Sequence, residues 1–169
     1  NVTGSNTLTV SNNLTTDGTG GGLTKNGTGT LTLSGAGNNY TGITTVNAGT
    51  LTLGANQNLG AIAGAGALNL SSYTLTTNAT SNTTYSGVIS GTGGALTKNG
   101  TSTLTLSGNN TYSGATTLNA GTLALNSATA LGTGTLTIAG GTLNNTSRGS
   151  ITLSNNNVQN WNGDFTFAG

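Results

Sequence analysis

The sequence predicts an all-β protein whose chain winds into a β-solenoid of about eight coils. Three observations support this prediction. A long polar segment occurs twice, apolar residues alternate with threonine along the chain, and the 169 residues contain no proline. Polar repeats of this length are typical of arrays whose units stack on one another, rather than of globules built around one site.

The repeat has a period of 72–73 residues. The matched segments are 18–27 with 91–100, 30–35 with 103–108, and 47–51 with 119–123. This period divides the chain into a partial unit (1–16) and two further units (17–89 and 90–169). We therefore expect residues 1–169 to be a single β-solenoid segment of a longer protein, in keeping with a sequence that starts without methionine.

Short strands are predicted where apolar residues alternate with Thr, Asn or Ala. In chain order these segments are 7–10, 30–33, 50–53, 68–70, 104–106, 123–125, 136–138, 151–153 and 165–167. A period of two residues indicates a strand with one buried and one wet face. Gly, Asn and Ser separate the segments, and Gly and Asn suit tight corners because they tolerate positive φ. The lack of proline suits strands that have neighbours on both sides.

A solenoid explains the composition better than a two-sheet sandwich does. The core of a sandwich of this size usually contains more aromatic residues than one Trp and two Phe. A solenoid has a thin core in which few large side chains are needed. With roughly 20 residues per coil and about 4.8 Å between coils, the chain would form a rod roughly 40 Å long.

The charge balance argues against several classes of partner. The net charge is +1 and only 3% of the residues are charged, whereas nucleic acids and anionic membranes are bound through many Lys and Arg side chains. No stretch approaches the roughly 20 apolar residues of a membrane helix. We therefore expect no nucleic-acid partner and no membrane insertion by this segment.

The residue types needed for catalysis are also scarce. There is no His and no Cys, so the commonest general base, the thiolate nucleophile and the usual zinc ligands are missing. The only carboxylates are Asp17 and Asp164, near opposite ends of the chain, whereas a glycosidase needs two within about 5–9.5 Å. The Gly-rich turns complete no phosphate-binding or calcium-binding motif. We expect no catalytic residue, no cofactor, no metal and no enzymatic activity.

The charged residues that remain have simple interpretations. Lys25 and Lys98 occupy equivalent places in the two units, and we expect them to be exposed charges on the same corner of each unit. Contact with an acidic glycan or an acidic partner is the alternative. Arg148 is expected to lie in a loop, and Asp17 and Asp164 at turns or caps.

Four aromatic residues recur in one local pattern. Tyr40, Tyr85, Tyr112 and Trp161 are each followed by a small polar residue and then Gly. The first interpretation is structural, with each ring packed over a glycine corner or the edge of the core. The second is ligand contact, in which the rings form a platform that stacks on sugars.

Threonine suggests a further alternative, an ice-binding ladder. The motif Thr-Leu-Thr begins at residues 7, 30, 50, 74, 103 and 135. An ice-binding surface needs one such pair in register on every coil, but the spacing of these motifs along the chain is irregular. Alternating Thr is also expected on any wet strand face.

Two segments resemble a known repeat family. Residues 94–123, with Leu96-Thr97-Lys98-Asn99-Gly100 and Tyr112-Ser113-Gly114, are similar to the autotransporter-associated β-strand repeat, also called the passenger-associated transport repeat. Residues 23–53 form a second copy and residues 85–91 resemble the family's lead-in. Residues 158–167 resemble a segment that accompanies these repeats in very large bacterial surface proteins.

The resemblance implies a right-handed parallel β-helix outside a bacterial cell, within the passenger of an autotransporter or a similar secreted protein. In that family the repeat is thought to assist export by folding outside the membrane. We therefore expect a structural segment of an extracellular or cell-surface rod, as an adhesin stalk or filament. The expected partners are neighbouring copies or flanking repeats, through end-to-end stacking of strands, with glycans or other cell surfaces as the alternative.

The composition also predicts how stability responds to pH. Stability should depend little on pH between about 4 and 9, because almost no side chain titrates in that range.

Overall fold

The computed structural model describes residues 5–15 and 20–169. These residues form 19 strands and no helix, arranged in three parallel sheets of five, eight and six strands. The eight strands of the largest sheet correspond to about eight turns of a β-solenoid. The prediction of an all-β solenoid of this size is confirmed.

The strands of each sheet follow, from one end of the chain to the other. The five-strand sheet contains β1 (Thr7–Val10), β3 (Thr30–Leu33), β5 (Thr50–Leu53), β8 (Ala67–Asn69) and β11 (Ile89–Ser90). The eight-strand sheet contains β2 (Leu23–Lys25), β4 (Ile43–Val46), β7 (Ala61–Gly64), β10 (Thr83–Tyr85), β13 (Thr103–Leu106), β15 (Thr122–Leu125), β17 (Thr142–Asn145) and β19 (Thr166–Ala168). The six-strand sheet contains β6 (Gln57–Leu59), β9 (Thr74–Thr77), β12 (Ala95–Lys98), β14 (Thr116–Leu118), β16 (Leu136–Ile138) and β18 (Gln159–Trp161).

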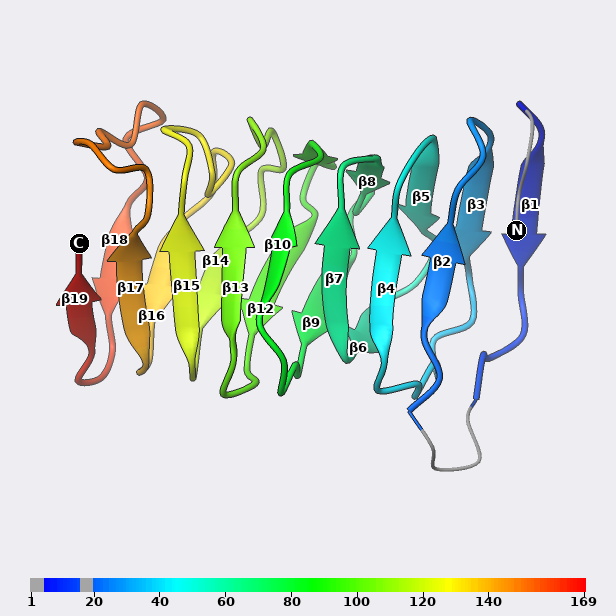
Figure 1. Ribbon diagram of the computed structural model, residues 1–169, viewed down its shortest axis with the longest axis horizontal. Coiled ribbons are helices and arrows are strands. Elements are labelled where there is room, and N and C mark those ends of the chain that lie inside the picture. The colour runs from blue at the N-terminus through cyan, green and yellow to red at the C-terminus, as the bar shows by residue number, and fades with distance from the viewer. Residues whose placement is uncertain (1–4, 16–19) are drawn as a thin grey trace.

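Each strand pairs in parallel with the strand one turn away. Leu31 pairs with Leu51, and Leu51 pairs in turn with Leu68, which is a shorter step along the chain. Near the other end, Leu143 pairs with Phe167 over a longer step. The turns therefore differ in length while the strands stay in register, and the corners absorb the difference. Figure 1 shows the eight-strand sheet in front, with its strands side by side along the rod.

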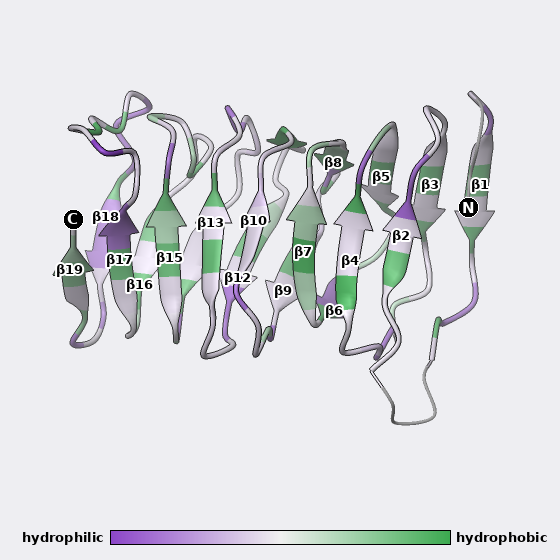
Figure 2. Ribbon diagram, viewed as in Figure 1, coloured by the Kyte–Doolittle hydropathy of each residue, from purple (hydrophilic) through white to green (hydrophobic). Residues whose placement is uncertain are grey.

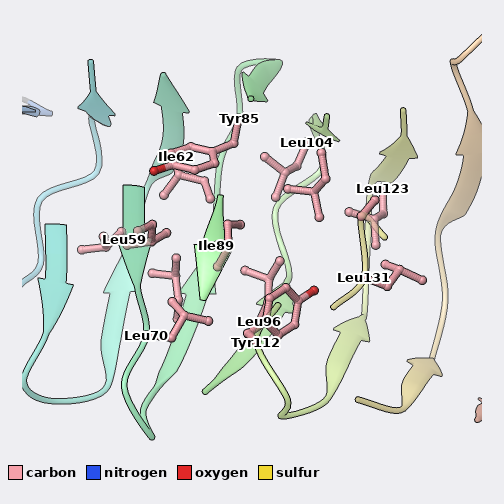
Figure 3. Packing of buried hydrophobic residues seen from close by; sticks show 14 of the residues in the cluster. Leu59, Ile62, Leu70, Tyr85, Ile89, Leu96, Leu104, Tyr112, Leu123 and Leu131 are labelled. Atoms are coloured by element: carbon pink, nitrogen blue, oxygen red, sulfur yellow. The ribbon is translucent and has the colours of Figure 1, made fainter. Parts of the chain in front are cut away.

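The core is a stack of apolar residues between the sheets. Leu104, Leu123 and Leu143 are partners in successive strands of the eight-strand sheet and are all buried. Burial of one leucine side chain contributes about 1.5–3 kcal/mol. Figure 2 shows apolar bands recurring in the strands of this sheet, and Figure 3 shows the buried side chains filling the space inside.

One predicted strand is wrong, because residues 151–153 form no strand. Ile151 and Leu153 are half-buried and pack against the core, so the alternating pattern correctly indicates a buried face. The strand is missing because the segment lies on a face of the solenoid where the ladder has already ended: the five-strand sheet stops at β11. The other eight predicted segments coincide or overlap with strands.

The long repeat does not correspond to a whole number of turns. From β2, three turns lead through β4 and β7 to β10, and two further faces lead to β12. One period of the repeat is therefore three and two-thirds turns, and the second copy is rotated by one face. Accordingly Leu31 lies in the five-strand sheet, whereas its equivalent Leu104 lies in the eight-strand sheet.

Candidate functional site

Lys25 and Lys98 lie inside the solenoid. Both side chains are 0% exposed, so the prediction that they are exposed charges is wrong. The Nζ atom of Lys25 donates hydrogen bonds to the carbonyl of Gly27 and, at 3.1 Å, to that of Ala48 one turn away. The alternation itself contained the signal, because Lys25 follows Leu23 by two residues and must share its inward face.

Lys98 repeats this arrangement in the second copy. Its Nζ atom donates to the carbonyl of Gly100 and, at 3.3 Å, to that of Ala120. These carbonyls turn into the corner, where a buried acceptor without a donor would cost about 1–3 kcal/mol. Burial lowers the pKa of Lys98, because the charged ammonium loses its hydration and gains only neutral partners. The lysine therefore acts as an internal clamp between two corners.

Glycine is required beside each clamp. Gly49 and Gly121 have φ values of 65° and 70°, in the left-handed region that other residues avoid. A Cβ atom on Gly121 would lie 2.3 Å from the Gly100 carbonyl oxygen and 2.7 Å from Lys98 Nζ. The glycine of the Asn-Ala-Gly sequence in both copies is thus explained by its left-handed backbone and by the close approach of corner carbonyls and of the lysine.

The three repeated tyrosines are also core residues. Tyr40 is 4% exposed, and Tyr85 and Tyr112 are 0% exposed. The Tyr85 hydroxyl donates to the Gly66 carbonyl at 2.8 Å. Burial raises the pKa of all three. The alternative that these three tyrosines contact a ligand is wrong, because their rings are covered by the coils.

The Tyr40 and Tyr112 hydroxyls form matching hydrogen bonds. Tyr40 shares one with the Thr44 hydroxyl at 3.0 Å, and Tyr112 shares one with the Thr116 hydroxyl at 2.5 Å. Thr44 and Thr116 are fully buried. In each copy this hydrogen bond joins the segment before a strand to the strand itself, β4 or β14, and so helps to fix where the strand begins.

Two buried asparagines, which no sequence pattern singled out, bridge the turns. Asn110 accepts a hydrogen bond from the Ile89 N–H at 2.8 Å and donates to the Ala130 carbonyl at 2.6 Å. Its equivalent Asn38 accepts from the Leu14 N–H and donates to Gln57, both at 2.5 Å. Each side chain replaces a rung of the ladder on a face where the repeat has no strand.

The C-terminal end of the solenoid is open and apolar. A hollow of about 290 Å³ leads into the end of the core. Its apolar lining includes Leu125, Leu143, Ile151, Leu153, Phe165 and Phe167. Trp161 lies edge-on to Phe165, with the ring centroids 5.4 Å apart. Trp161 and Phe167 are 67% and 68% exposed.

The remaining candidate residues do not form a cluster. Arg148 lies on an exposed loop, as predicted, with φ of 63°, and Asp164 is exposed near the C-terminal end. Asp17 lies outside the described residues. Among the described residues, no group of three or more His, Cys, Asp or Glu side chains could hold a metal ion, and no helix is long and apolar enough to span a membrane.

The threonine pairs divide among the sheets. Those beginning at residues 7, 30 and 50 are in register on the five-strand sheet, although their spacing in sequence looked irregular. Those beginning at 74, 103 and 135 fall on or beside strands of the other two sheets. The ladder of pairs on the five-strand sheet extends over three turns and ends at Ala67 and Asn69, which take the next positions.

These features define a class, a repeat-built parallel β-solenoid whose buried polar groups join one turn to the next. The family comparison is more specific: residues 23–53 and 96–125 match the model of the passenger-associated-transport-repeat. No match was found among curated proteins or among solved structures. Each matched segment covers β2 to β5 or β12 to β15, in which the second two strands stack on the first two.

Proposed function

We propose that this chain is a structural segment of an extracellular bacterial rod, an autotransporter-like passenger stalk or surface filament. The observation that carries the proposal is the ladder of parallel strands in the eight-strand sheet, which runs unbroken from β2 to β19 in a chain that matches a passenger-associated repeat twice. Such a ladder transmits load along the axis through many backbone hydrogen bonds. The side chains of Thr, Asn and Ser keep the sides wet with almost no charge.

The matched repeat suits a chain that folds as it emerges from a membrane. Each matched copy stacks two strands directly on two earlier ones. Its contacts therefore join parts of the chain that are only one turn apart, so that a copy can form its ladder before later parts of the chain are present. Each folded copy then offers edges on which the next turn can be built.

Surface display tests the proposed location. An epitope inserted at the exposed corner residue Thr101 in the full-length parent protein should bind antibody on intact cells. The matched control is the same epitope on a periplasmic protein, which should bind only after permeabilisation. Detection of the Thr101 epitope only in permeabilised cells would contradict the proposal.

We also propose that the ends of the rod bind a second copy. At one end β1 and β2, and at the other β18 and β19, are the outermost strands of their sheets in the described chain. Unpaired edges template further pairing, and exposed apolar residues occur at both ends: Leu8 is 49% exposed and Phe167 is 68% exposed. A net charge of +1 adds little repulsion between copies.

The winding of the chain favours one orientation for this contact. The chain ends on the eight-strand face after β19, and the next face along the winding is the one that carries β1. A second copy that continues the winding without rotation therefore places its β2 on β19 and its β1 over segment 146–158. That segment contributes Ile151 and Leu153, which can pack against the alternating Leu8 and Val10 of the next copy. Head-to-tail contacts of this kind build open filaments.

Electron microscopy of the concentrated chain tests the stacking. Filaments with an axial repeat of roughly 40 Å, the length of eight stacked turns, are expected. The double variant Trp161→Ser, Phe167→Ser should abolish them. Val88→Ser is the control, because Val88 is 43% exposed but lies in the middle of the chain. Dispersed monomers at high concentration would contradict stacking and leave the proposed location untouched.

Trp161 supports a second candidate, adhesion to carbohydrate. Its exposed ring beside Phe165 is the one repeated aromatic position that lies on the surface of the described chain, and aromatic faces suit stacking on sugars. A glycan array separates the two functions. Glycan binding that is lost in Trp161→Ala and kept in Val88→Ala would favour adhesion. An array on which the chain binds no glycan would contradict adhesion, and the structural role would then be the one remaining function.

A further inference from the structure

The basic residues of this chain differ sharply in accessibility. There are three, Lys25, Lys98 and Arg148. Both lysines are fully buried, and their ammonium groups are bonded to carbonyls inside the corners. Arg148 is exposed on a loop. An endopeptidase that selects basic side chains therefore meets one of its three potential sites in accessible form.

The backbone around Arg148 is also open to a protease. The N–H of Thr146 still bonds to the Leu125 carbonyl at 2.9 Å, and the ladder resumes only where the N–H of Ser154 bonds to Ala128 at 3.1 Å. In the described chain, residues 147–152 make no backbone–backbone hydrogen bond. Their conformation is held by side chains instead: Asn145 Nδ2 and Ser147 Oγ donate to the Gly149 carbonyl at 2.7 and 2.8 Å.

This loop can be drawn into an extended form without breaking any backbone–backbone hydrogen bond. A protease binds several residues around the cleaved bond as an extended strand, and exposed loops of small polar residues are preferred sites of cleavage. The loop sequence Thr146-Ser147-Arg148-Gly149-Ser150 meets this requirement. The positive φ of Arg148, 63°, is unfavourable for a residue with a Cβ atom and is relieved when the loop extends.

We propose that the Arg148–Gly149 peptide bond is a processing site for an arginine-directed endopeptidase. The guanidinium of Arg148 would donate two parallel hydrogen bonds to a carboxylate in the protease pocket, an arrangement that selects arginine over lysine. Water adds across the amide bond, so that Arg148 gains a carboxylate and Gly149 an amino group. No other reactant is needed.

Cleavage would change how the last turn of the described chain is attached to the turns before it. Residues 149–169 contain β18, β19 and the aromatic side chains of the end hollow. After cleavage this last turn is attached by the ladders of β18 with β16 and of β19 with β17, by the packing of the hollow, and by hydrogen bonds such as those from Asn157 to the Gly132 and Gly134 carbonyls. No covalent bond then joins residues 149–169 to residues 1–148 of the chain.

Limited digestion of the folded chain tests the proposal. Trypsin and an arginine-specific endopeptidase should both give two products, residues 1–148 and 149–169, identified by mass spectrometry in denaturant. Arg148→Gln should slow cleavage at least ten-fold with either enzyme. Arg148→Lys should restore cleavage by trypsin but not by the arginine-specific enzyme. Circular dichroism of each variant checks that the solenoid remains folded.

A basic residue on a tight corner provides the matched control. Thr101→Arg, made in the Arg148→Gln background, places a guanidinium on an exposed corner between β12 and β13, and it should be cleaved much more slowly than the wild-type loop. Equal cleavage at position 101 would show that exposure alone decides. A first cut at Lys25 or Lys98, or a cut at Arg148 that appears only when denaturant unfolds the chain, would overturn the proposal.

Discussion

Lys98 shows how one inward-facing residue sets a local property of the rod. Its ammonium group is buried and is bonded to two neutral carbonyls. The charge costs free energy, whereas the two hydrogen bonds recover part of it. The side chain joins the corner at Gly100 to the corner at Ala120, one turn later, and so holds the register of the two turns.

Stability should rise with pH in the alkaline range because of Lys98. Its pKa is lower in the folded state than in the unfolded chain, so the unfolded state binds more protons between the two values and unfolding becomes less favourable as pH rises through them. A pKa difference of one between the two states corresponds to about 1.4 kcal/mol. We expect the Tm of the wild type to rise between pH 7 and 9.5, by thermal melts followed with circular dichroism.

The Lys98→Met variant should lack this rise, and Arg148→Met should keep it because Arg148 is exposed. The melts stop below pH 10 because, above that pH, the buried tyrosines lower the free energy of unfolding as pH rises. Their pKa values are raised by burial, so ionisation of the unfolded chain destabilises the fold. Parallel curves for the wild type and Lys98→Met would contradict the assignment. The burial of Lys98 thus limits the expectation of pH-independent stability at its alkaline end.

At the scale of the element, the segments that follow β11 on the face of the five-strand sheet show how successive turns stay hydrogen-bonded where no strand forms. Residues 107–115 pass over β11, where the Thr111 N–H bonds to the Ile89 carbonyl at 2.8 Å. Asn110 supplies the neighbouring contacts with its side chain. Asn157 acts similarly in a later turn, with its Nδ2 donating to the Gly134 carbonyl at 2.6 Å.

Asn110→Ala should therefore destabilise the fold strongly. It leaves the Ile89 N–H and the Ala130 carbonyl without the partner seen in the structure, and two such buried groups cost about 2–6 kcal/mol. Asn126→Ala is the matched control: Asn126 is exposed, and such surface changes stay within about 0.5 kcal/mol. Urea unfolding measures both, and equal midpoints for the two variants would contradict the bridging role.

At the scale of the whole molecule, the rotation of the repeat by one face matters most. Each period moves equivalent side chains to the neighbouring face that precedes theirs along the winding, so that three periods return to the starting face. A lateral binding surface would therefore not form one stripe along tandem units. This distribution suits a rod that bears load equally on its three sides.

Deletion of residues 26–98 should give a shorter but folded solenoid. It joins Lys25 to Asn99, so that β13 takes the place of β3, and both strands have the sequence Thr-Leu-Thr-Leu. The equivalent lysine, asparagine and tyrosine contacts then re-form with the preserved first turn. Far-UV circular dichroism and a cooperative melt check this outcome.

A second deletion provides the control for the first. Removal of residues 26–88 joins Lys25 directly to Ile89, so that no corner residues separate β2 from β11, and this product should not fold. Failure of the 26–98 deletion to fold, or equal melts for the two products, would contradict the equivalence of the two copies.

The sequence by itself determined the solenoid class, the repeat and most of its alternating strands, because period-two patterning and stacking are local properties of the chain. It did not reveal that Lys25 and Lys98 face inward, that Asn110 replaces a ladder rung, or that residues 151–153 lack a strand partner. Nor did it show that the irregularly spaced threonine pairs of β1, β3 and β5 lie in register. Only the tertiary structure decided these points, because each depends on which turn lies next to which. Because the turns vary in length, the sequence does not specify which residue of the next turn a given residue will pair with; the strand pairing of the folded chain decides this.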